Sequence, residues 1–291
     1  MVTTVTIGHL LREGMERLKE ANIPTPGLDA EVLLYNLLGV ERIYLYMYRE
    51  KEVSKEIQKE FWIGIEKRAK HMPIQYIVNR QEFMGLDFWV EKGVLIPRAD
   101  TEILVEKIID IYKSNYYPHT VRIMDIGTGS GAIAVSLAKY IDNCIITAID
   151  ICPNALKVAV KNADFHKVKH KIMFYSGNLF EPINKQDEYG TYDFIVSNPP
   201  YIPKSEIKTL GSNVKDYEPC LALDGGEDGL DYYKKITPEA KHYLKKGGWL
   251  LFEIGYSQGK DVSKILNING FKNIDILKDL AGLDRVAIGA T

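Results

Sequence analysis

The four residues Asn198-Pro199-Pro200-Tyr201 carry the pattern in this chain that is best suited to chemistry. They follow the apolar residues 194–196, which predict a short buried strand. Two consecutive prolines cannot continue the hydrogen-bond ladder of a sheet, so the chain must leave the strand at Asn198. A stiff polar tip is therefore expected at the carboxyl end of a strand, which is where open α/β sheets bind ligands.

Two oxygen atoms of this tip suit a planar NH2 group. The Asn198 side chain and the Pro199 carbonyl supply acceptors that can face the same way, and Tyr201 adds an aromatic face against which a flat amide or base can lie. Pro200 stiffens the tip and lacks an N–H. On these four residues alone, a plain strand-ending turn is an equal alternative, because Asn-Pro commonly opens turns.

A second candidate site is a glycine run that follows the predicted strand 121–126 and precedes an apolar-periodic helix. Its glycines allow a tight turn close to a ligand, next to the free N–H groups of the helix. Asp150 closes the following strand, 19 residues after the run, where a carboxylate can accept hydrogen bonds from both hydroxyls of a ribose. An adenosine cofactor is predicted. The run consists of Gly127, Thr128, Gly129, Ser130 and Gly131.

The identity of that cofactor depends on Asp125. Gly127, Gly129 and Ala132 also satisfy the dinucleotide pattern, so a nicotinamide cofactor is an alternative. Asp125 stands two residues before the first glycine, where its carboxylate could hold a cationic amino group. S-adenosylmethionine carries such a group and NAD does not, so Asp125 favours S-adenosylmethionine.

The second half of the chain must position both candidate sites. Strand and helix patterns alternate there, which predicts an α/β, Rossmann-like and mostly parallel sheet. About seven strands are expected in one sheet. They lie at residues 121–126, 145–149, 172–175, 194–196, 249–254, 274–277 and 286–288.

The first part of the chain predicts a different architecture. Helical patterns at residues 7–18, after Thr25-Pro26 and at 54–70 indicate a small helical domain over residues 1–73. Residues 74–95 turn β-like around Gly85, which predicts a β-hairpin linker before the domain 96–291. A helix opens near Thr101, with Asp100 or Thr101 as its cap, and Arg98 beside it could meet a ligand carboxylate.

The composition is that of an ordinary globular protein. The 291 residues hold 37 Lys and Arg against 39 Asp and Glu, so no strong field directs the chain to nucleic acid or membrane. Three cysteines without CxxC spacing argue against a disulfide framework and for a reducing compartment. Neither a signal peptide nor a membrane-spanning run is recognisable, so a cytoplasmic location is expected. His166 and His170 lie in a Lys-rich run without an acid motif, and no metal site is expected.

The order of these motifs resembles class I S-adenosylmethionine-dependent methyltransferases that act on planar nitrogens. Together with residues 96–98 (Ile-Pro-Arg), residues 217–230 and the helical start, the chain resembles specifically the release factor glutamine N5-methyltransferases (HemK/PrmC type). This resemblance covers essentially the whole chain. It implies peptide chain release factors as partners, with the glutamine of their Gly-Gly-Gln loop as the methyl acceptor. It also implies cofactor contacts from Ile151, Asn178 and Leu179, where relatives can carry an aromatic residue in place of Leu179.

The chemistry of such a transfer explains why two acceptors are needed. An amide nitrogen is a poor nucleophile because its lone pair is delocalised into the carbonyl. If Asn198 and Pro199 accept its two N–H bonds, they orient the nitrogen and stabilise the positive charge that grows on it. No general base and no catalytic histidine are expected.

Other functions remain open at this point. The same tip would serve a nucleic-acid methyltransferase that acts on adenine N6 or guanine N2, since exocyclic amines have similar geometry. The near-neutral charge argues against direct nucleic-acid binding. A ribosomal-protein glutamine is a closer alternative substrate. A nicotinamide oxidoreductase or a non-catalytic nucleotide-binding module would share the glycine run but not the need for the tip.

Overall fold

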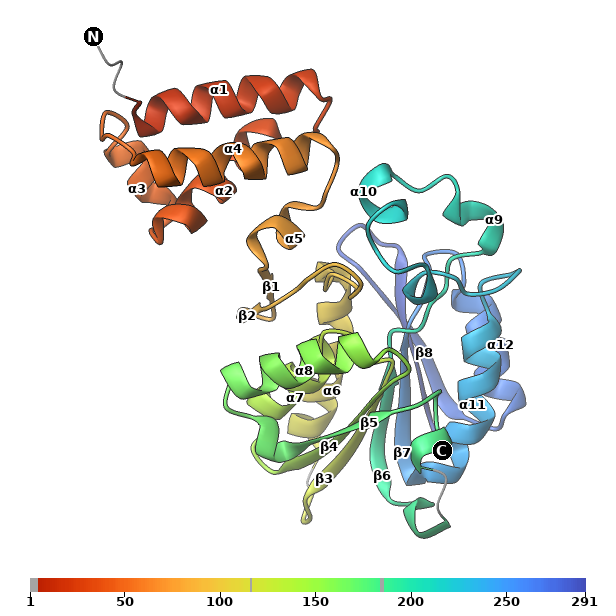
Figure 1. The fold of residues 1–291 in the computed structure, drawn as a ribbon. Coiled ribbons are helices and arrows are strands. Elements are labelled where there is room, and N and C mark those ends of the chain that lie inside the picture. The colour runs from red at the N-terminus through yellow and green to blue at the C-terminus, as the bar shows by residue number, and fades with distance from the viewer. Residues whose placement is uncertain (1–4, 116, 184–185) are drawn as a thin grey trace. The chain divides into compact units, whose positions relative to one another are not determined.

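The computed structural model describes residues 5–115, 117–183 and 186–291 (Figure 1). The chain divides into two compact units. The helical unit comprises residues 1–80 and 211–217, and the sheet unit comprises residues 81–210 and 218–291. Residues 1–4 of the expected helical domain lie outside the described part. Among the described helices, none is long and apolar enough to cross a bilayer.

The helical unit contains the three long helices that the sequence predicts. Side-chain oxygens of Thr6 and Ser54 accept hydrogen bonds from the backbone N–H groups at the starts of α1 and α4, and Gly39 ends α2 in the left-handed region with φ 65°. Their buried faces include Leu18, Leu34 and other apolar residues. The helices of this unit are α1 (Ile7–Glu20), α2 (Pro26–Leu38), α3 (Arg42–Met47), α4 (Lys55–Ala69), α5 (Ile74–Val78) and α10 (Ser212–Lys215).

The segment predicted to be β-like from residue 74 starts as a helix instead. Pro73 precedes α5 with φ −53°, and Asn79 ends it in the left-handed region with φ 54°. The fixed φ of proline suits entry into a helical turn, which outweighed the β propensity of the apolar residues behind it. The hairpin itself is shorter than expected, with β1 (Gln81–Phe83) and β2 (Leu86–Phe88) joined through Met84 and Gly85, both at positive φ.

The sheet unit is built on a seven-stranded sheet, as predicted. The strand order is β5-β4-β3-β6-β7-β9-β8, and β9 is antiparallel to both of its neighbours. Helices α6, α7 and α8 cover one face and α11 and α12 the other (Figure 1). The strands are β3 (Val121–Ile126), β4 (Cys144–Asp150), β5 (Ile172–Ser176), β6 (Tyr192–Ser197), β7 (Leu244–Glu253), β8 (Lys272–Lys278) and β9 (Asp284–Ala290). The main helices are α6 (Glu102–Ser114), α7 (Ala132–Tyr140), α8 (Pro153–Phe165), α11 (Asp231–Tyr243) and α12 (Gly259–Ile268).

The strand order explains how distant motifs meet. The chain runs outward from β3 through β4 to β5, then returns to place β6 on the other side of β3. In the parallel register, Ile126 is paired with Ile149 on one side and with Ser197 on the other. The loops that leave β3, β4 and β6 therefore open at one crevice, at the switch point of the sheet.

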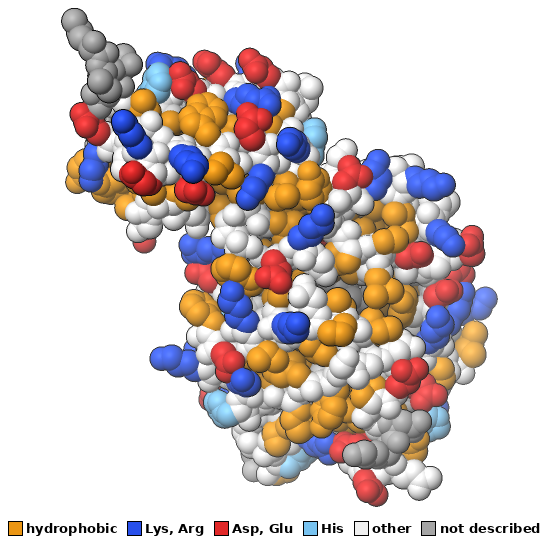
Figure 2. All heavy atoms as spheres, in the orientation of Figure 1, with side chains coloured by type: hydrophobic (Ala, Val, Ile, Leu, Met, Phe, Trp, Pro, Cys, Tyr) orange, Lys and Arg blue, Asp and Glu red, His pale blue; other side chains and the backbone are white. Residues whose placement is uncertain are grey.

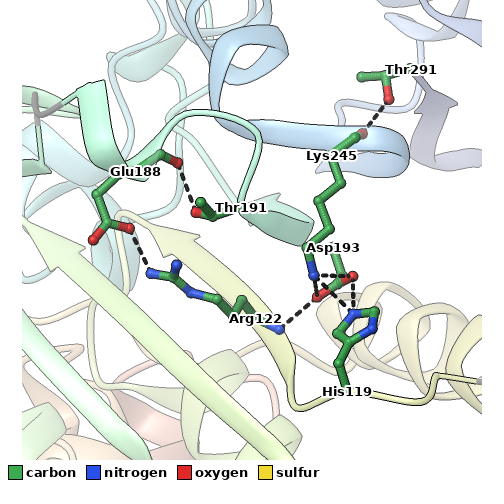
Figure 3. A network of polar contacts seen from close by, with 7 residues as sticks. All are labelled: His119, Arg122, Glu188, Thr191, Asp193, Lys245 and Thr291. Carbon is green, nitrogen blue, oxygen red and sulfur yellow. Dashed lines mark hydrogen bonds and ion pairs between the residues drawn. The ribbon is translucent and has the colours of Figure 1, made fainter.

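The amino-terminal end of β6 is held by a separate polar network (Figure 3). Asp193 is 5% exposed, and both of its carboxylate oxygens lie 2.8 Å from Lys245 Nζ. Oδ1 also contacts His119 Nε2 at 2.8 Å, and Oδ2 accepts from the backbone N–H of Arg122 at 2.8 Å. A buried carboxylate with this many partners joins β3, β6 and the start of β7.

We expect Asp193→Asn to lower the free energy of unfolding by about 1.5–3 kcal/mol, because hydrogen bonds to a charged group are lost from a buried site. Denaturant titration measures this loss. Asp164→Asn is the matched control, since Asp164 pairs with Lys169 on the surface and should cost less than about 1 kcal/mol. Equal losses in the two variants would contradict a structural role of the Asp193 network.

Candidate active site

A pocket of the sheet unit lies at the carboxyl ends of β3, β4 and β6, where the switch point opens the crevice. Its wall includes residues 127–130, 150–151, 178–179 and 198–200, which join both sequence motifs in one site. Most of the side chains predicted to bind cofactor or substrate therefore line one pocket. Among the described lining residues, Asp125, Gly131 and Tyr201 are absent.

The glycine loop is shaped by backbone conformations that favour glycine. Gly127, Gly129 and Gly131 have φ of 74°, 58° and 80°. The N–H groups of Gly127 and Thr128 both donate to the carbonyl of Ile149, at 2.8 and 2.9 Å, which ties the loop to the end of β4. A Cβ on Gly131 would lie 3.0 Å from the Cβ of Ala159 on α8. Gly131 thus allows close packing behind the pocket and does not form its wall.

Asp150 ends β4 at the edge of the pocket, with 9% of its surface exposed. Its Oδ2 accepts from Gly129 N and its Oδ1 from Cys152 N, each at 2.8 Å. Burial raises the pKa of Asp150, and these two backbone hydrogen bonds oppose the rise. Because a carboxylate has about four lone-pair sites, each oxygen retains the capacity to accept from a ligand hydroxyl.

Asp125 lies beneath the glycine loop and is fully buried. Its Oδ2 accepts from Thr128 Oγ1 at 2.6 Å, while its Oδ1 has no hydrogen-bond partner among the described residues. Burial raises the pKa of Asp125 to about 7, and the Thr128 bond opposes that rise. The backbone N–H of Ala134, at the start of α7, also faces this carboxylate and lowers its pKa. Contact of Asp125 with the amino group of a cofactor remains a prediction, because Asp125 is fully buried and does not line the pocket.

The three residues assigned to the cofactor by resemblance all line the pocket. Ile151 is 50% exposed, and Leu179 is partly buried with a positive φ of 52°. The side chain and backbone N–H of Asn178 both point to Glu181, at 3.4 and 3.3 Å. A left-handed backbone is unusual for leucine, so the turn after β5 holds this apolar side chain in the wall at some cost in strain.

The tip after β6 presents Asn198 to the pocket on a well-supported backbone. Pro199 is buried, and Asn198 and Pro200 are half-buried. Asn198 Nδ2 donates to Thr101 Oγ1 at 3.2 Å, and its Oδ1 makes no hydrogen bond within the described chain. One side-chain acceptor is therefore free at the place where the sequence predicts an NH2 group.

Tyr201 follows the tip but does not line the pocket. Its ring packs among the apolar residues under α11, and its hydroxyl donates to Glu253 Oε1 at 3.3 Å. Burial, followed by the neighbouring Glu253 charge, raises the pKa of Tyr201. Its backbone carbonyl accepts from Gln258 Nε2 at 3.0 Å. These contacts anchor the tip, and contact of the Tyr201 ring with an acceptor group remains a prediction.

The segment around Arg98 also differs from expectation. Arg98 lines the pocket but forms an ion pair with Glu218, whose side chain is 1% exposed. Glu218 would thus compete with a ligand carboxylate for this guanidinium, and a ligand contact of Arg98 remains a prediction. Thr101 does not cap α6, because its hydroxyl donates to Glu253 instead of accepting from the helix. Thr101 therefore belongs to the surroundings of the site, although its place before a helix indicates a cap.

Other residues of the site lay outside the sequence prediction. Glu253 is 1% exposed at the end of β7, and Leu221 and Tyr232 line the pocket. An acidic residue that closes a buried apolar strand is a signal that would have identified Glu253, by the same reasoning that identified Asp150. Leu221 and Tyr232 carry no such signal.

The pocket fits S-adenosylmethionine. Asp150 would accept hydrogen bonds from its ribose hydroxyls, and the apolar side chains of Ile151 and Leu179 would pack against its adenine. Asp125, which is predicted to hold its cationic amino group, lies outside the pocket wall. The backbone of the glycine loop would hold the cofactor from one side. When S-adenosylmethionine is bound, it supplies an electrophilic methyl group on a sulfonium.

The fold and the site define a class, that of the Rossmann-like, S-adenosylmethionine-dependent methyltransferases. Two family models match the chain: the PrmC N-terminal domain over residues 9–78 and the methyltransferase small domain over residues 99–214. The release factor glutamine methyltransferase of Clostridium acetobutylicum is 44% identical over 272 residues, which are 93% of each chain. That of Geobacter sulfurreducens is 40% identical over 284 residues, 98% of this chain and 93% of the relative.

The chain belongs to the release factor glutamine methyltransferase family. Solved structures that resemble it in fold include the N-terminal domain of human METTL16 in complex with SAH, with a TM-score of 0.51 and 18% identity. This likeness covers 70% of this chain and 75% of that one. At such low identity it concerns the fold alone.

Proposed function

We propose that this protein methylates the side-chain amide nitrogen, N5, of the glutamine in the Gly-Gly-Gln loop of peptide chain release factors. The observation that carries the proposal is that Asn198 lines the same pocket as the glycine loop and Asp150, while its Oδ1 makes no hydrogen bond to the described residues. The names of the relatives support release factors as the substrate.

In this proposal the residues after β6 position the acceptor. Asn198 Oδ1 and the Pro199 carbonyl accept the two N–H bonds of the glutamine amide and hold its nitrogen toward the cofactor. As that nitrogen becomes positively charged, the two oxygens stabilise it, so their contribution grows toward the transition state. Positioning alone is able to contribute about 7–11 kcal/mol in favourable intramolecular cases. Asp150 and the glycine loop hold the other reactant.

The proposed division of labour follows the sequence prediction. Residues 96–291 would carry the transfer, residues 74–95 would link, and residues 1–73 would dock the release factor. The helical unit supports a docking role with an apolar surface group on α3, where Ile43 is 61% and Met47 is 67% exposed. Because release factors act on ribosomes, we propose the cytoplasm as the place of action.

Direct action on nucleic acid is the weaker candidate. Acidic and basic side chains intermingle on the face shown in Figure 2, with no broad single-sign surface there that would attract a phosphate backbone. The likeness to METTL16 does not favour it, since that likeness concerns the fold.

The test is incubation of the protein and S-adenosylmethionine with release factor, ribosomal protein, rRNA and DNA, followed by mass spectrometry. We expect a single added methyl group on the Gly-Gly-Gln glutamine, and none on a release factor with Gln→Asn at that site. Methylation of rRNA or DNA with release factor left unmodified would overturn the proposal.

A further inference from the structure

We infer that Thr101 and Glu253 set the orientation of the Asn198 amide, and so decide which of its ends meets the acceptor nitrogen. They are positioning residues, because the proposed function gives neither of them a contact with the substrate. The inference rests on the proposed function, in which Asn198 must accept and not donate. It follows from the polarity of a short chain of hydrogen bonds.

The chain begins at Glu253, which is buried at the carboxyl end of β7. Its neighbour Phe252 is paired with Ser197, so Glu253 stands beside the place where the tip leaves β6. Glu253 Oε2 accepts from Thr101 Oγ1, and Oε1 accepts from the Tyr201 hydroxyl at 3.3 Å. Both hydroxyls can donate to an ionised carboxylate, which has no proton to offer in return.

Thr101 transmits this polarity to Asn198. A hydroxyl has one proton, and the Thr101 proton is directed to Glu253. Toward Asn198, Thr101 Oγ1 is thus an acceptor, and it bonds to the NH2 end of the amide, with Nδ2 to Oγ1 at 3.2 Å. Oδ1 is left for the pocket. A reversed amide would place an NH2 group against the NH2 group of the substrate, and the contact would become repulsive.

The surroundings of Glu253 make its ionised form costly, and its neighbours offset part of that cost. Burial raises its pKa to about 7, while the Thr101 bond and the charge of Arg285 on β9 oppose that rise. Asp100 raises the pKa further, and Tyr201 and Tyr233 also face the group. Glu253 therefore changes its charge near neutral pH, within the range in which turnover can be measured.

Protonation of Glu253 reverses the polarity of this hydrogen-bond relay, which runs from Glu253 through Thr101 to Asn198. A neutral Glu253 is able to donate to Thr101, whose own proton is then free to point toward Asn198, where the NH2 group cannot accept it. Rotation of the amide would relieve this clash by turning Oδ1 toward Thr101, and Oδ1 would then be lost to the acceptor nitrogen. Turnover should therefore be high above the pKa of Glu253 and fall as the pH drops through it. Asp125 has a pKa in the same region and is the rival source of such a pH dependence.

The experiment compares Thr101→Val, which keeps the side-chain shape but has no hydroxyl, with Thr101→Ser, which restores it. We expect Thr101→Val to lower kcat about 10- to 100-fold, with the KM for S-adenosylmethionine within about threefold, because misorientation of a positioning group has effects of that size. Thr101→Ser should recover most of the loss. Thr147→Val is the control, since Thr147 is a buried threonine whose hydroxyl bonds to Tyr192 at 3.1 Å, outside the pocket.

The pH profile supplies a readout that a merely structural role would not move. We expect the acidic limb of kcat in the wild type to disappear in Glu253→Gln, with thermal stability at pH 8 equal to or above that of the wild type. An acidic limb that persists in Glu253→Gln would assign it to another group and overturn the relay. The inference would also be overturned if Thr101→Ser and Thr101→Val lost kcat equally, or if Thr101→Val lost none. If wild-type protein methylates no glutamine at all, the proposed function fails instead.

Discussion

Replacing Asn198 with alanine is expected to lower kcat for release factor methylation by about 10²–10³-fold. The size is that observed when one preorganised hydrogen-bonding group is removed from a developing charge. The Kd of S-adenosylmethionine should change only a few-fold, because Asn198 orients the acceptor more than it holds the donor. Single-turnover kinetics with calorimetric titration of the cofactor separate these two quantities.

The control for that variant is Asn269→Ala. Asn269 is also half-buried and uses its amide for one hydrogen bond, to Ile265 O at 2.8 Å, but it lies after α12 and does not line the pocket. Its kcat should match the wild type. A near-wild-type kcat in Asn198→Ala would refute the role given to the side-chain oxygen, whatever the control shows.

Replacing Asp150 with alanine is expected to produce the opposite kinetic pattern. The Kd of S-adenosylmethionine should rise about 100-fold, which corresponds to about 2.7 kcal/mol and to the loss of two hydrogen bonds to a charged acceptor. The variant also leaves Gly129 N without its partner at 2.8 Å, which loosens the glycine loop. At saturating cofactor, kcat should stay within about fivefold of the wild type.

Asp150→Asn refines this test. An asparagine keeps one acceptor oxygen, so its Kd should fall between those of the wild type and of Asp150→Ala. Isothermal titration with S-adenosylhomocysteine measures the Kd of the wild type and of both variants without turnover. An unchanged Kd in both variants would exclude Asp150 from the ribose contact and would leave the glycine loop to account for affinity.

Local patterns predicted most of the fold because each strand of the sheet carries its own signal. Val121 to Ile126 and Tyr192 to Ser197 are apolar runs ended by glycine or by Asn-Pro, and such ends are visible in one dimension. The helix at Ile74 was missed because a single proline before a short apolar stretch is compatible with either structure. Nothing in the local sequence separated the two.

Residues of the site could be predicted only where a local sequence pattern marks them. Asn198 and Asp150 each end a strand, so their position at the crevice follows from topology. Thr101 was assigned to a helix cap because its partner Glu253 lies 152 residues away, and no local pattern reports a contact at that separation. For Tyr201, likewise, no local pattern reports the bond of its hydroxyl to Glu253, which lies 52 residues away.

A crystal structure of the protein with S-adenosylhomocysteine and a release factor tests the central claim most directly. We predict that the glutamine amide nitrogen lies about 3 Å from both Asn198 Oδ1 and the Pro199 carbonyl oxygen, the distance of an N–H···O hydrogen bond. A glutamine bound in the pocket with its nitrogen directed elsewhere, and with neither oxygen bonded to it, would contradict the account.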